Sequence, residues 1–133
     1  MADESFFTGS KHVLELHPKD YVEGNDHPWK LKKAPGEAER SAVLYYASWC
    51  GHCIRFKDTW EALYRVNGCM KLCAFNCAKY DAYYRDRLNF SEAVRGFPSI
   101  VFYKGTDPIE TYQGTRNPPD ELVKTMLMFC KRH

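Results

Sequence analysis

The sequence predicts an α/β domain in which a central mixed β-sheet is flanked by helices on both faces. Residues 41–47 and 70–77 are almost continuously apolar and rich in β-forming residues, as strands buried on both faces are. Between them lies a helical pattern with apolar residues at 3.6-residue spacing, and a second such pattern closes the chain. Strands that alternate with helices along a chain are typical of a largely parallel sheet covered by helices.

Length and composition limit the classes of protein to consider. The chain has 133 residues, of which 44% are hydrophobic and 27% charged, enough for one domain with its own core. The net charge of +2 comes from interspersed signs without a basic stripe, so no nucleic-acid partner is expected. No apolar run has the length that a membrane span needs. We expect an N-terminal extension over residues 1–10 and one domain over residues 11–131.

The first elements precede the sequence "WCGHC". A strand over residues 12–16 alternates weakly and ends before Pro18. A short helix is expected near "KDYVEG" (19–24), followed by a loop around "KKAPGEAER" (32–40), because prolines and glycines interrupt this stretch. The strand over 41–47 then leads directly into two cysteines.

A helix is expected over residues 52–66, with Gly68 as its C-terminal cap. Its apolar stripe comprises Phe56, Trp60, Leu63 and Tyr64. The strand over 70–77 follows, and then a polar-faced helix in "AKYDAYYRDRLNF" (78–90).

The last third of the chain predicts a hairpin and a helix. Strands over 99–105 and 109–114 are joined by a turn near "GTDP" and pair antiparallel, which makes the sheet mixed. The closing helix in "NPPDELVKTMLMFCKRH" starts after two prolines. It places Leu122, Met126 and Phe129 on one face.

Cys50 and Cys53 stand at the junction of a buried strand and a helix, with Gly51 and His52 between them. The pair could be half of a zinc site, a structural bridge, or a dithiol that cycles with its disulfide. A structural zinc needs four ligands, and the nearest other cysteines lie on a different element and repeat by four. At a strand-to-helix junction, C-x-x-C is typical of a redox pair. We therefore expect no metal and no cofactor beyond the Cys50–Cys53 disulfide itself.

The positions of the two cysteines predict different roles. Free amide groups and the dipole at the helix start would stabilise a thiolate at Cys50, which makes it the attacking nucleophile. Cys53 lies nearly one turn further in and would resolve the mixed disulfide. A cationic His52 between them would favour the reduced thiolate and make the disulfide more oxidising.

Four motifs, "ASWCGHC", "TWEAL", "RGFPSIVFY" and "YQGTR", resemble the thioredoxin-fold catalytic domain of the protein disulfide isomerase family over roughly residues 10–131. The thioredoxin domain of quiescin-type sulfhydryl oxidases is similar too. The resemblance implies a thioredoxin fold and a thiol–disulfide oxidoreductase that acts on unfolded or folding cysteine-containing proteins. It also implies glutathione or an upstream oxidase as redox partner. The location it implies is the endoplasmic reticulum lumen or elsewhere in the secretory pathway, with a signal peptide already removed.

The same resemblance implies roles for residues outside the cysteine pair. Pro98 corresponds to the family's cis proline facing the disulfide, and Phe97 before it would offer a backbone edge to a substrate chain. Trp49 corresponds to a tryptophan that shields the site. Arg116 corresponds to an arginine that approaches the resolving cysteine and lowers its pKa. The residues alone also allow a proline that starts a strand, a core tryptophan and a surface arginine.

Three positions depart from the family pattern. Leu44 stands where many members bury a glutamate that relays the proton of the resolving thiol, and Ala74 replaces the lysine that often pairs with it. Their joint replacement is coherent, because one charge without its partner would cost about 3–5 kcal/mol. Asp58 replaces a proline that kinks the active-site helix, so a straighter helix is expected.

The other four cysteines are harder to assign. In the implied fold, Cys69 and Cys130 would approach each other at the pole away from the active site and form a structural disulfide. Four cysteines allow three pairings, and the sequence does not choose among them. Cys73 is expected to be a small core residue. Cys77 matches a quiescin-type cysteine, but Tyr84 stands where its partner would be.

Two other functions stay open beside an isomerase-type enzyme. One is the thioredoxin domain of a sulfhydryl oxidase, which would pass electrons to a flavin domain outside this chain. The other is a chaperone-like module that binds substrates and has weak redox activity, which would follow from the missing proton relay.

Overall fold

The computed structural model of the chain describes residues 4–24, 29–37, 39–88, 94 and 96–133. Among these residues, no helix combines the length and the apolar character that crossing a membrane requires.

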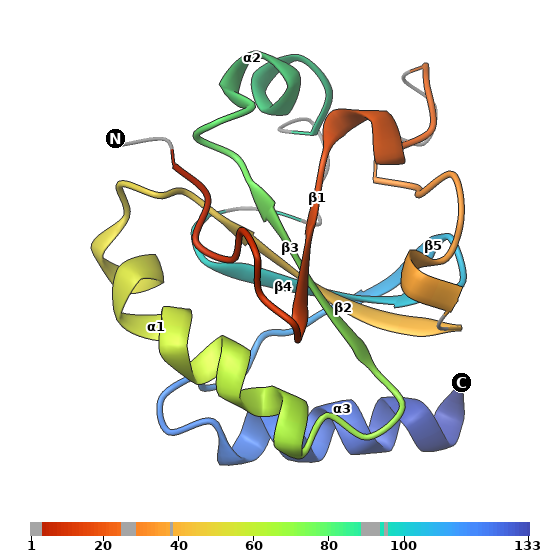
Figure 1. Cartoon of the computed structure of the whole chain (residues 1–133). Helices are drawn as coiled ribbons and strands as arrows, with labels where there is room; N and C mark the ends of the chain where they lie inside the picture. The colour runs from red at the N-terminus through yellow and green to blue at the C-terminus, as the bar shows by residue number, and fades with distance from the viewer. Residues whose placement is uncertain (1–3, 25–28, 38, 89–93, 95) are drawn as a thin grey trace.

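Five strands form one mixed sheet in the spatial order β1–β3–β2–β4–β5 (Figure 1). Their bounds are β1 Val13–Leu16, β2 Arg40–Tyr46, β3 Lys71–Asn76, β4 Ser99–Lys104 and β5 Asp107–Thr111. The first three strands pair in parallel, whereas β4 pairs antiparallel with both β2 and β5. The predicted mixed sheet is confirmed, and each strand begins and ends within three residues of its predicted bounds.

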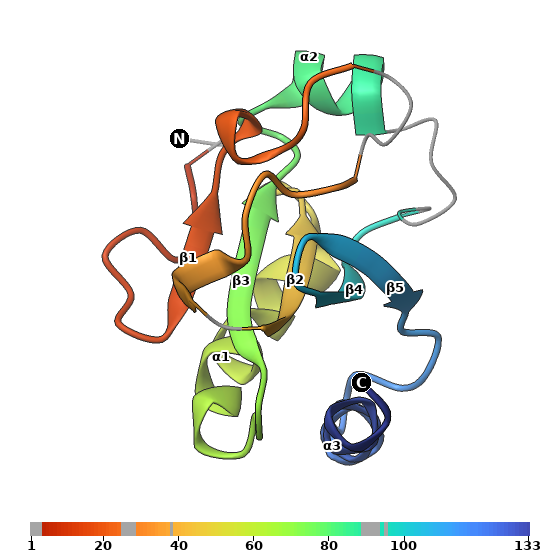
Figure 2. The same cartoon turned by 90° about the vertical axis from the view of Figure 1, so that its right-hand side faces the viewer.

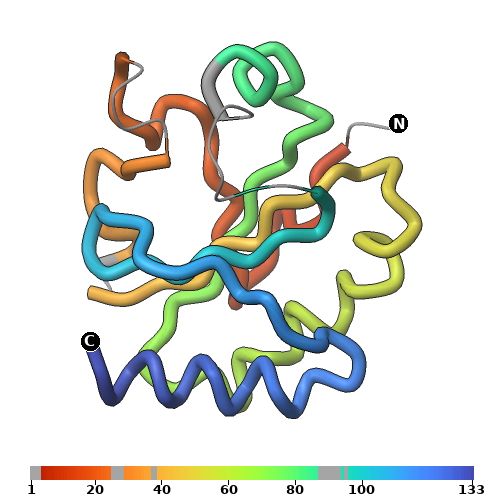
Figure 3. Tube along the Cα trace, turned by 180° about the vertical axis from the view of Figure 1, so that it is seen from behind, coloured from red at the N-terminus to blue at the C-terminus, as the bar shows by residue number. Residues whose placement is uncertain are grey.

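Two long helices, α1 (Gly51–Ala62) and α3 (Asp120–Arg132), lie on the same face of the sheet (Figures 1 and 3). The side chains of every second strand residue point toward them, as the two-residue period of a strand requires. The core on this face includes Ala42, Leu44, Tyr46, Leu72, Ala74, Ile100, Phe102, Phe56, Trp60, Leu122, Met126 and Phe129. This face carries the active-site helix, so its packing sets the position of the cysteine pair.

The opposite face is covered by the segment that follows β1 and by α2 (Asp81–Tyr83), which continues as the π-helical turn η4 (Tyr84–Leu88). Figure 2 shows α2 and the segment after β1 at the same end of the molecule. Helical elements thus contribute to both faces, although the second face is covered largely by irregular chain.

Buried hydroxyl groups on this second face satisfy one another. Tyr21 and Tyr45 lie 2.8 Å apart at their hydroxyl oxygens, and Tyr45 and Tyr103 lie 2.6 Å apart. The Tyr103 hydroxyl donates to the carbonyl of Trp29 at 2.7 Å. A buried hydroxyl without a partner would be destabilising, so this row of hydrogen bonds allows three tyrosines to lie in the core.

Two predicted helices differ from the structure. The helix expected near residues 19–24 is a single 3-10 turn, η1 (Pro18–Asp20). Its continuation is prevented because Tyr21 forms a β-bridge with Leu31. The helix expected over 78–90 consists of α2 and η4 only, and the last two residues of that prediction lie outside the described residues.

The active-site helix also ends earlier than predicted. After Ala62 it tightens into a 3-10 turn, η3 (Leu63–Arg65), which rotates Tyr64 off the buried stripe. Tyr64 is exposed and stacks on His12, with ring centroids 3.6 Å apart. Gly68 was predicted to cap the helix, but the C-cap of η3 is Val66, two residues earlier; the φ of 61° at Gly68 favours glycine in the turn that follows.

The residues predicted as an N-terminal extension pack against the domain. Phe7 is buried in the core under α1, and Phe6 stacks on Tyr46 with ring centroids 4.4 Å apart. Residues 1–3 of that prediction lie outside the described residues.

Candidate active site

Cys50 is the N-cap residue of α1 and follows the end of β2 by four residues. Its backbone is extended, with φ −79° and ψ 122°, and its amide donates to the carbonyl of Ala47 at 2.9 Å. Its own carbonyl accepts the first helical hydrogen bond, from the amide of Ile54 at 3.0 Å. Cys50 therefore occupies the N-cap position, although its sulfur makes no capping hydrogen bond to the helix amides, and 8% of the residue is exposed.

Cys53 lies in the first turn of α1 and is fully buried. Burial raises the pKa of the Cys53 thiol to about 12, and the neighbouring Cys50 adds to this rise. A hydrogen bond from the Ala47 amide and the charge of Arg116 act in the opposite direction. Both cysteines are thiols in this structure, with Cys50 the more accessible of the two.

The loop before β4 lies against Cys50. The Phe97–Pro98 peptide bond is cis, and the Cys50 sulfur lies 3.7 Å from the carbonyl oxygen of Phe97. Pro98 is buried, and Ser99 begins β4, so Pro98 precedes the strand that it was alternatively expected to start. The cis-proline loop therefore places the Phe97 carbonyl beside the Cys50 sulfur.

Trp49 is not a core residue, since 64% of it is exposed. Its ring meets Phe97 edge to face, with centroids 6.1 Å apart, and Tyr84 packs on Phe97 at 5.4 Å. Ile54, one turn along α1, is 53% exposed. These side chains form an apolar surface next to the cysteine pair.

His52 is exposed and is engaged by Arg55, whose Nη2 lies 3.0 Å from His52 Nδ1. A guanidinium only donates hydrogen bonds, so His52 Nδ1 is the acceptor in this contact. The expected effect of His52 on the cysteine pair stays a prediction. Gly51 is exposed between the cysteines, and a Cβ there would meet Arg55 Nη1 at an ordinary 3.4 Å.

Arg116 comes from the loop between β5 and α3. Its Nη1 donates to the carbonyl of Pro98 at 3.3 Å, and its charge lowers the pKa of Cys53. It is therefore not a remote surface arginine. The structure brings together Cys50, Cys53, Pro98 and Arg116 from three separate parts of the chain.

Leu44 and Ala74 are direct partners across β2 and β3, and both are fully buried on the α1 side. The two replaced family positions thus form one apolar contact, without a stranded charge. Asp58 is exposed in α1, and the helix continues through it to Ala62, as the sequence predicts.

Sequence reasoning missed a half-buried carboxylate in the same row of the sheet. Glu15 on β1 pairs with Ala74. Burial raises the pKa of the Glu15 carboxyl, which accepts from the Tyr46 hydroxyl at 2.5 Å and from the Phe7 amide at 3.1 Å. The signal in the sequence was that Glu15 stands two residues after Val13 in a strand, so that both side chains point to the same, core-facing side.

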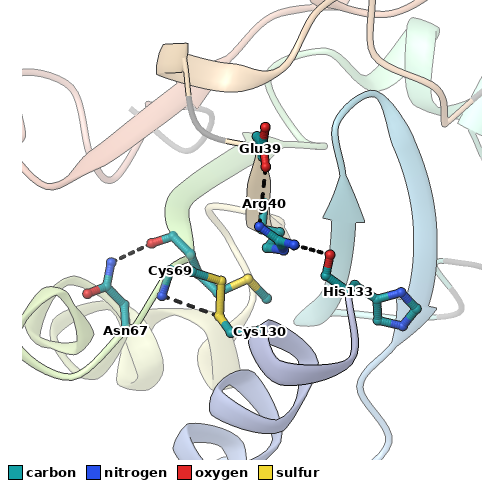
Figure 4. Close-up of a disulfide and its surroundings, with 7 residues drawn as sticks. Glu39, Arg40, Asn67, Cys69, Cys130 and His133 are labelled. Carbon is teal, nitrogen blue, oxygen red and sulfur yellow. Dashed lines mark hydrogen bonds and ion pairs between the residues drawn. A yellow bond between two sulfur atoms is a disulfide. The ribbon is translucent and has the colours of Figure 1, made fainter.

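Cys69 and Cys130 form a disulfide that links the turn after η3 to α3, with Cα atoms 5.9 Å apart (Figure 4). The structure selects this pairing among the three that the sequence leaves open. The Cys69 amide lies 3.3 Å from the Cys130 sulfur, and Arg40 of β2 donates to the carbonyl of His133 close by (Figure 4). The bridge lies at the opposite end of α1 from Cys50.

Cys73 and Cys77 are buried thiols on the second face of the sheet. Burial raises the pKa of Cys73 to about 12 and that of Cys77 in the same direction. Tyr84, in the position of a possible partner, packs on Phe97, and Cys77 is a free thiol. In the described part of the chain, no three histidine, cysteine, aspartate or glutamate side chains are grouped as a metal ion would need.

Comparisons with known proteins agree with this geometry. Protein disulfide-isomerase like 2-2 of Arabidopsis thaliana is 41% identical over 114 residues, which are 85% of this chain and 22% of that protein. Sulfhydryl oxidase 1 of Cavia porcellus is 44% identical over 69 residues, 47% of this chain and 10% of that protein. This chain therefore spans less than a quarter of the length of either relative.

A crystal structure of the J-Trx1 fragment of ERdj5 superposes with a TM-score of 0.65 at 18% identity, covering 95% of this chain and 55% of that one. This likeness concerns the fold. The model of the family described as Thioredoxin matches residues 22–128. With most of its length matched and its cysteine pair at the start of α1, the chain belongs to the thioredoxin family.

Proposed function

We propose that the chain is a thiol–disulfide oxidoreductase of the protein disulfide isomerase type, which forms, reduces or rearranges disulfides in protein substrates. The observation that carries the proposal is the placement of Cys50 at the start of α1, with its sulfur 3.7 Å from the Phe97 carbonyl and Cys53 buried behind it. Membership of the thioredoxin family and relatives named protein disulfide-isomerase support the same reaction class.

In the reducing direction, the Cys50 thiolate attacks one sulfur of a substrate disulfide. A bond forms between Cys50 and that sulfur, and the other substrate sulfur leaves as a thiolate. Cys53 then loses its proton, ultimately to the departing thiolates, and attacks the Cys50 sulfur. The second substrate thiol is released, two electrons have passed to the substrate, and Cys50–Cys53 is the new disulfide. Oxidation of a substrate dithiol is the reverse sequence.

The substrate would be an unfolded or folding chain that contains cysteine. The Phe97 and Pro98 carbonyls offer hydrogen-bond acceptors to an extended backbone beside the sulfur. Trp49 and Ile54, both largely exposed, offer apolar contact area without a shape that selects one sequence. The disulfide would be restored by glutathione or by an upstream oxidase.

The release step depends on removing the proton of a buried thiol. With Leu44 and Ala74 both apolar, no carboxylate stands at the position that the family uses. The Ala47 amide and Arg116 are the groups that favour the Cys53 thiolate. We infer that the mixed disulfide is resolved more slowly than it is formed.

An oxidising compartment, the endoplasmic reticulum lumen or another part of the secretory pathway, fits this function. The Cys69–Cys130 disulfide supports it, because exposed structural disulfides persist outside the reducing cytosol.

The decisive experiment replaces Cys53 with alanine. A C53A variant incubated with an oxidised substrate peptide should accumulate a stable adduct at Cys50, which intact-protein mass spectrometry detects. Cys73→Ala is the matched control, since it removes another buried thiol and should leave turnover intact. If C53A turns over normally or no adduct forms at Cys50, the proposed roles of the two cysteines are wrong.

The reduction potential of the pair in glutathione buffers would indicate the direction of the reaction. A value near −180 mV, as in protein disulfide isomerase, supports disulfide donation, whereas one near −270 mV, as in thioredoxin, supports reduction.

The match to sulfhydryl oxidase 1 favours a second candidate: a module that passes electrons from substrate thiols to a flavin domain elsewhere in a longer protein. A flavin-binding domain in the same parent protein, reduced when Cys50–Cys53 is reduced, would decide for it. A chaperone-like binding module instead predicts that peptide affinity survives the C50A/C53A double substitution while no exchange is measured in the unmodified protein.

A further inference from the structure

A polar cleft of about 330 Å³ lies beside the cysteine pair, between α1 and the loop that leads into α3. Arg55 and His52 line it from α1, and Arg116 lines it from the loop. None of its lining residues is acidic. The two guanidinium groups therefore make the cleft positively charged, and its lining includes His52, which stands between the two cysteines in the sequence.

Neither guanidinium is neutralised within the described residues. Arg55 uses Nη2 to contact His52, and Arg116 uses Nη1 to contact Pro98, which leaves most of the five N–H groups of each side chain for other acceptors. No described carboxylate forms an ion pair with either arginine.

Two acidic residues near the cleft, Glu121 and Asp58, do not pair with its arginines. Glu121 at the start of α3 accepts from the Thr115 amide at 3.5 Å and so helps to hold the loop. Asp58 lies three residues beyond Arg55 on α1, is exposed, and forms no ion pair with it. Glu121 therefore lies next to the lining residues Gly114 and Thr115, but it forms no ion pair with either arginine in the described part of the chain.

The cleft is close enough to the sulfur to contact the residues that flank a substrate cysteine. The Cys50 sulfur lies 3.7 Å from the Phe97 carbonyl, and the next carbonyl along the chain, that of Pro98, accepts from Arg116 at 3.3 Å. One residue of an extended substrate spans about 3.3–3.6 Å. A side chain one or two positions from the substrate cysteine can therefore reach the guanidinium groups.

We propose that this cleft is a subsite for a carboxylate of the thiol or disulfide substrate, held one or two residues from the reacting sulfur by Arg55 and Arg116. The inference rests on the proposed function and adds a substrate preference to it. Two sources carry this chemistry: an acidic side chain beside a cysteine of a protein substrate, and the carboxylates of a small peptide disulfide such as oxidised glutathione.

The test measures how fast four disulfides oxidise the reduced protein, with acid quenching and thiol counting by mass spectrometry. Two are cyclic peptides that differ only in glutamate or glutamine next to the cysteine. The others are oxidised glutathione and its tetraethyl ester, which lacks the negative charges. Each rate is divided by that of the partner substrate without the carboxylate charge, so that a general change in reactivity of a variant cancels.

In the unmodified protein the charged substrate of at least one pair should react roughly threefold to tenfold faster, the range expected for partly exposed arginine–carboxylate pairing. The ratio of the two rates should approach one in Arg55→Gln. It should persist in Arg65→Gln, which removes the same charge from the far end of the same helical segment. A preference in the peptide pair alone points to protein substrates, and in the glutathione pair alone to the small peptide.

Equal rates within both pairs would overturn the subsite and leave the proposed function standing, as would a preference that Arg65→Gln abolishes as fully as Arg55→Gln. A protein that exchanges with none of the four disulfides would refute the proposed function itself, and the subsite with it.

Discussion

Replacing both Cys69 and Cys130 with alanine should strongly destabilise the fold without touching the active site. The bridge joins residues 61 apart in the sequence. For a loop of that length the chain-entropy model gives about 4.3 kcal/mol at 25 °C, because the open unfolded chain gains freedom that the crosslink denies it. Cys69 is exposed and Cys130 half-buried, so little packing is lost with them. We expect the free energy of unfolding to fall by about 3–4 kcal/mol.

Urea unfolding followed by far-ultraviolet circular dichroism measures this loss, and thermal unfolding should show a midpoint lower by roughly 10–15 °C. The slope of free energy against urea should increase, since an unfolded chain without the bridge exposes more surface. A reductant that opens Cys69–Cys130 provides the control. It should lower the stability of the unmodified protein to that of the variant and leave the variant itself unchanged.

A loss below about 1 kcal/mol would refute the loop-closure reasoning, as would a reductant without effect on the unmodified protein. The rate of disulfide exchange at Cys50, measured without denaturant, should be retained in the C69A/C130A variant, because the bridge is at the other end of α1.

Four further predictions concern the buried side of the active site. Replacing Arg116 with glutamine removes a charge that lowers the pKa of Cys53. Resolution of the mixed disulfide should therefore slow by about threefold to tenfold, which quenched-flow experiments measure. An unchanged rate would show that the arginine has no such role. Burial raises the Cys53 pKa to about 12, so the resolution rate should climb throughout pH 6–9, and a plateau there would contradict that value. Because this folded-state pKa exceeds the ordinary value of about 8.5, the buried thiol stabilises the reduced protein fully below about pH 8.5, and this contribution is lost as the pH rises toward 12. Unfolding at pH 7 and pH 10 measures the loss, which should be smaller in C53A. Leu44→Glu should lower the free energy of unfolding, measured in urea, by about 3–5 kcal/mol because it buries an unpaired charge. Adding Ala74→Lys on the neighbouring strand should restore part of that stability. Identical losses in the single and double variants would disprove the pairing.

Local patterns were sufficient for the strands and for the reactive pair. The runs that contain β2 and β3 are apolar on both faces, which leaves a central strand as their stable state. A spacing of three places Cys50 at a helix start and Cys53 one turn inside, whatever surrounds the helix. Patterns failed where a neighbour intervened, as at Tyr21, whose bridge to Leu31 replaces the predicted helix.

Contacts between distant segments decided the remaining features of the site. Strand register makes Leu44 and Ala74 partners and sets Glu15 beside them, although no local pattern relates these three positions. The packing of α3 beside α1 chooses Cys130 as the partner of Cys69.

The fold class and the two reacting sulfurs thus follow from periodicity and spacing along the chain, since helix and strand geometry act over a few residues. The burial of Cys53, the approach of Arg116 and the pairing of two arginines around one cleft arise only when the sheet brings three loops to one edge. Burial and charge pairing depend on every group within several ångströms, and those groups are remote in the sequence.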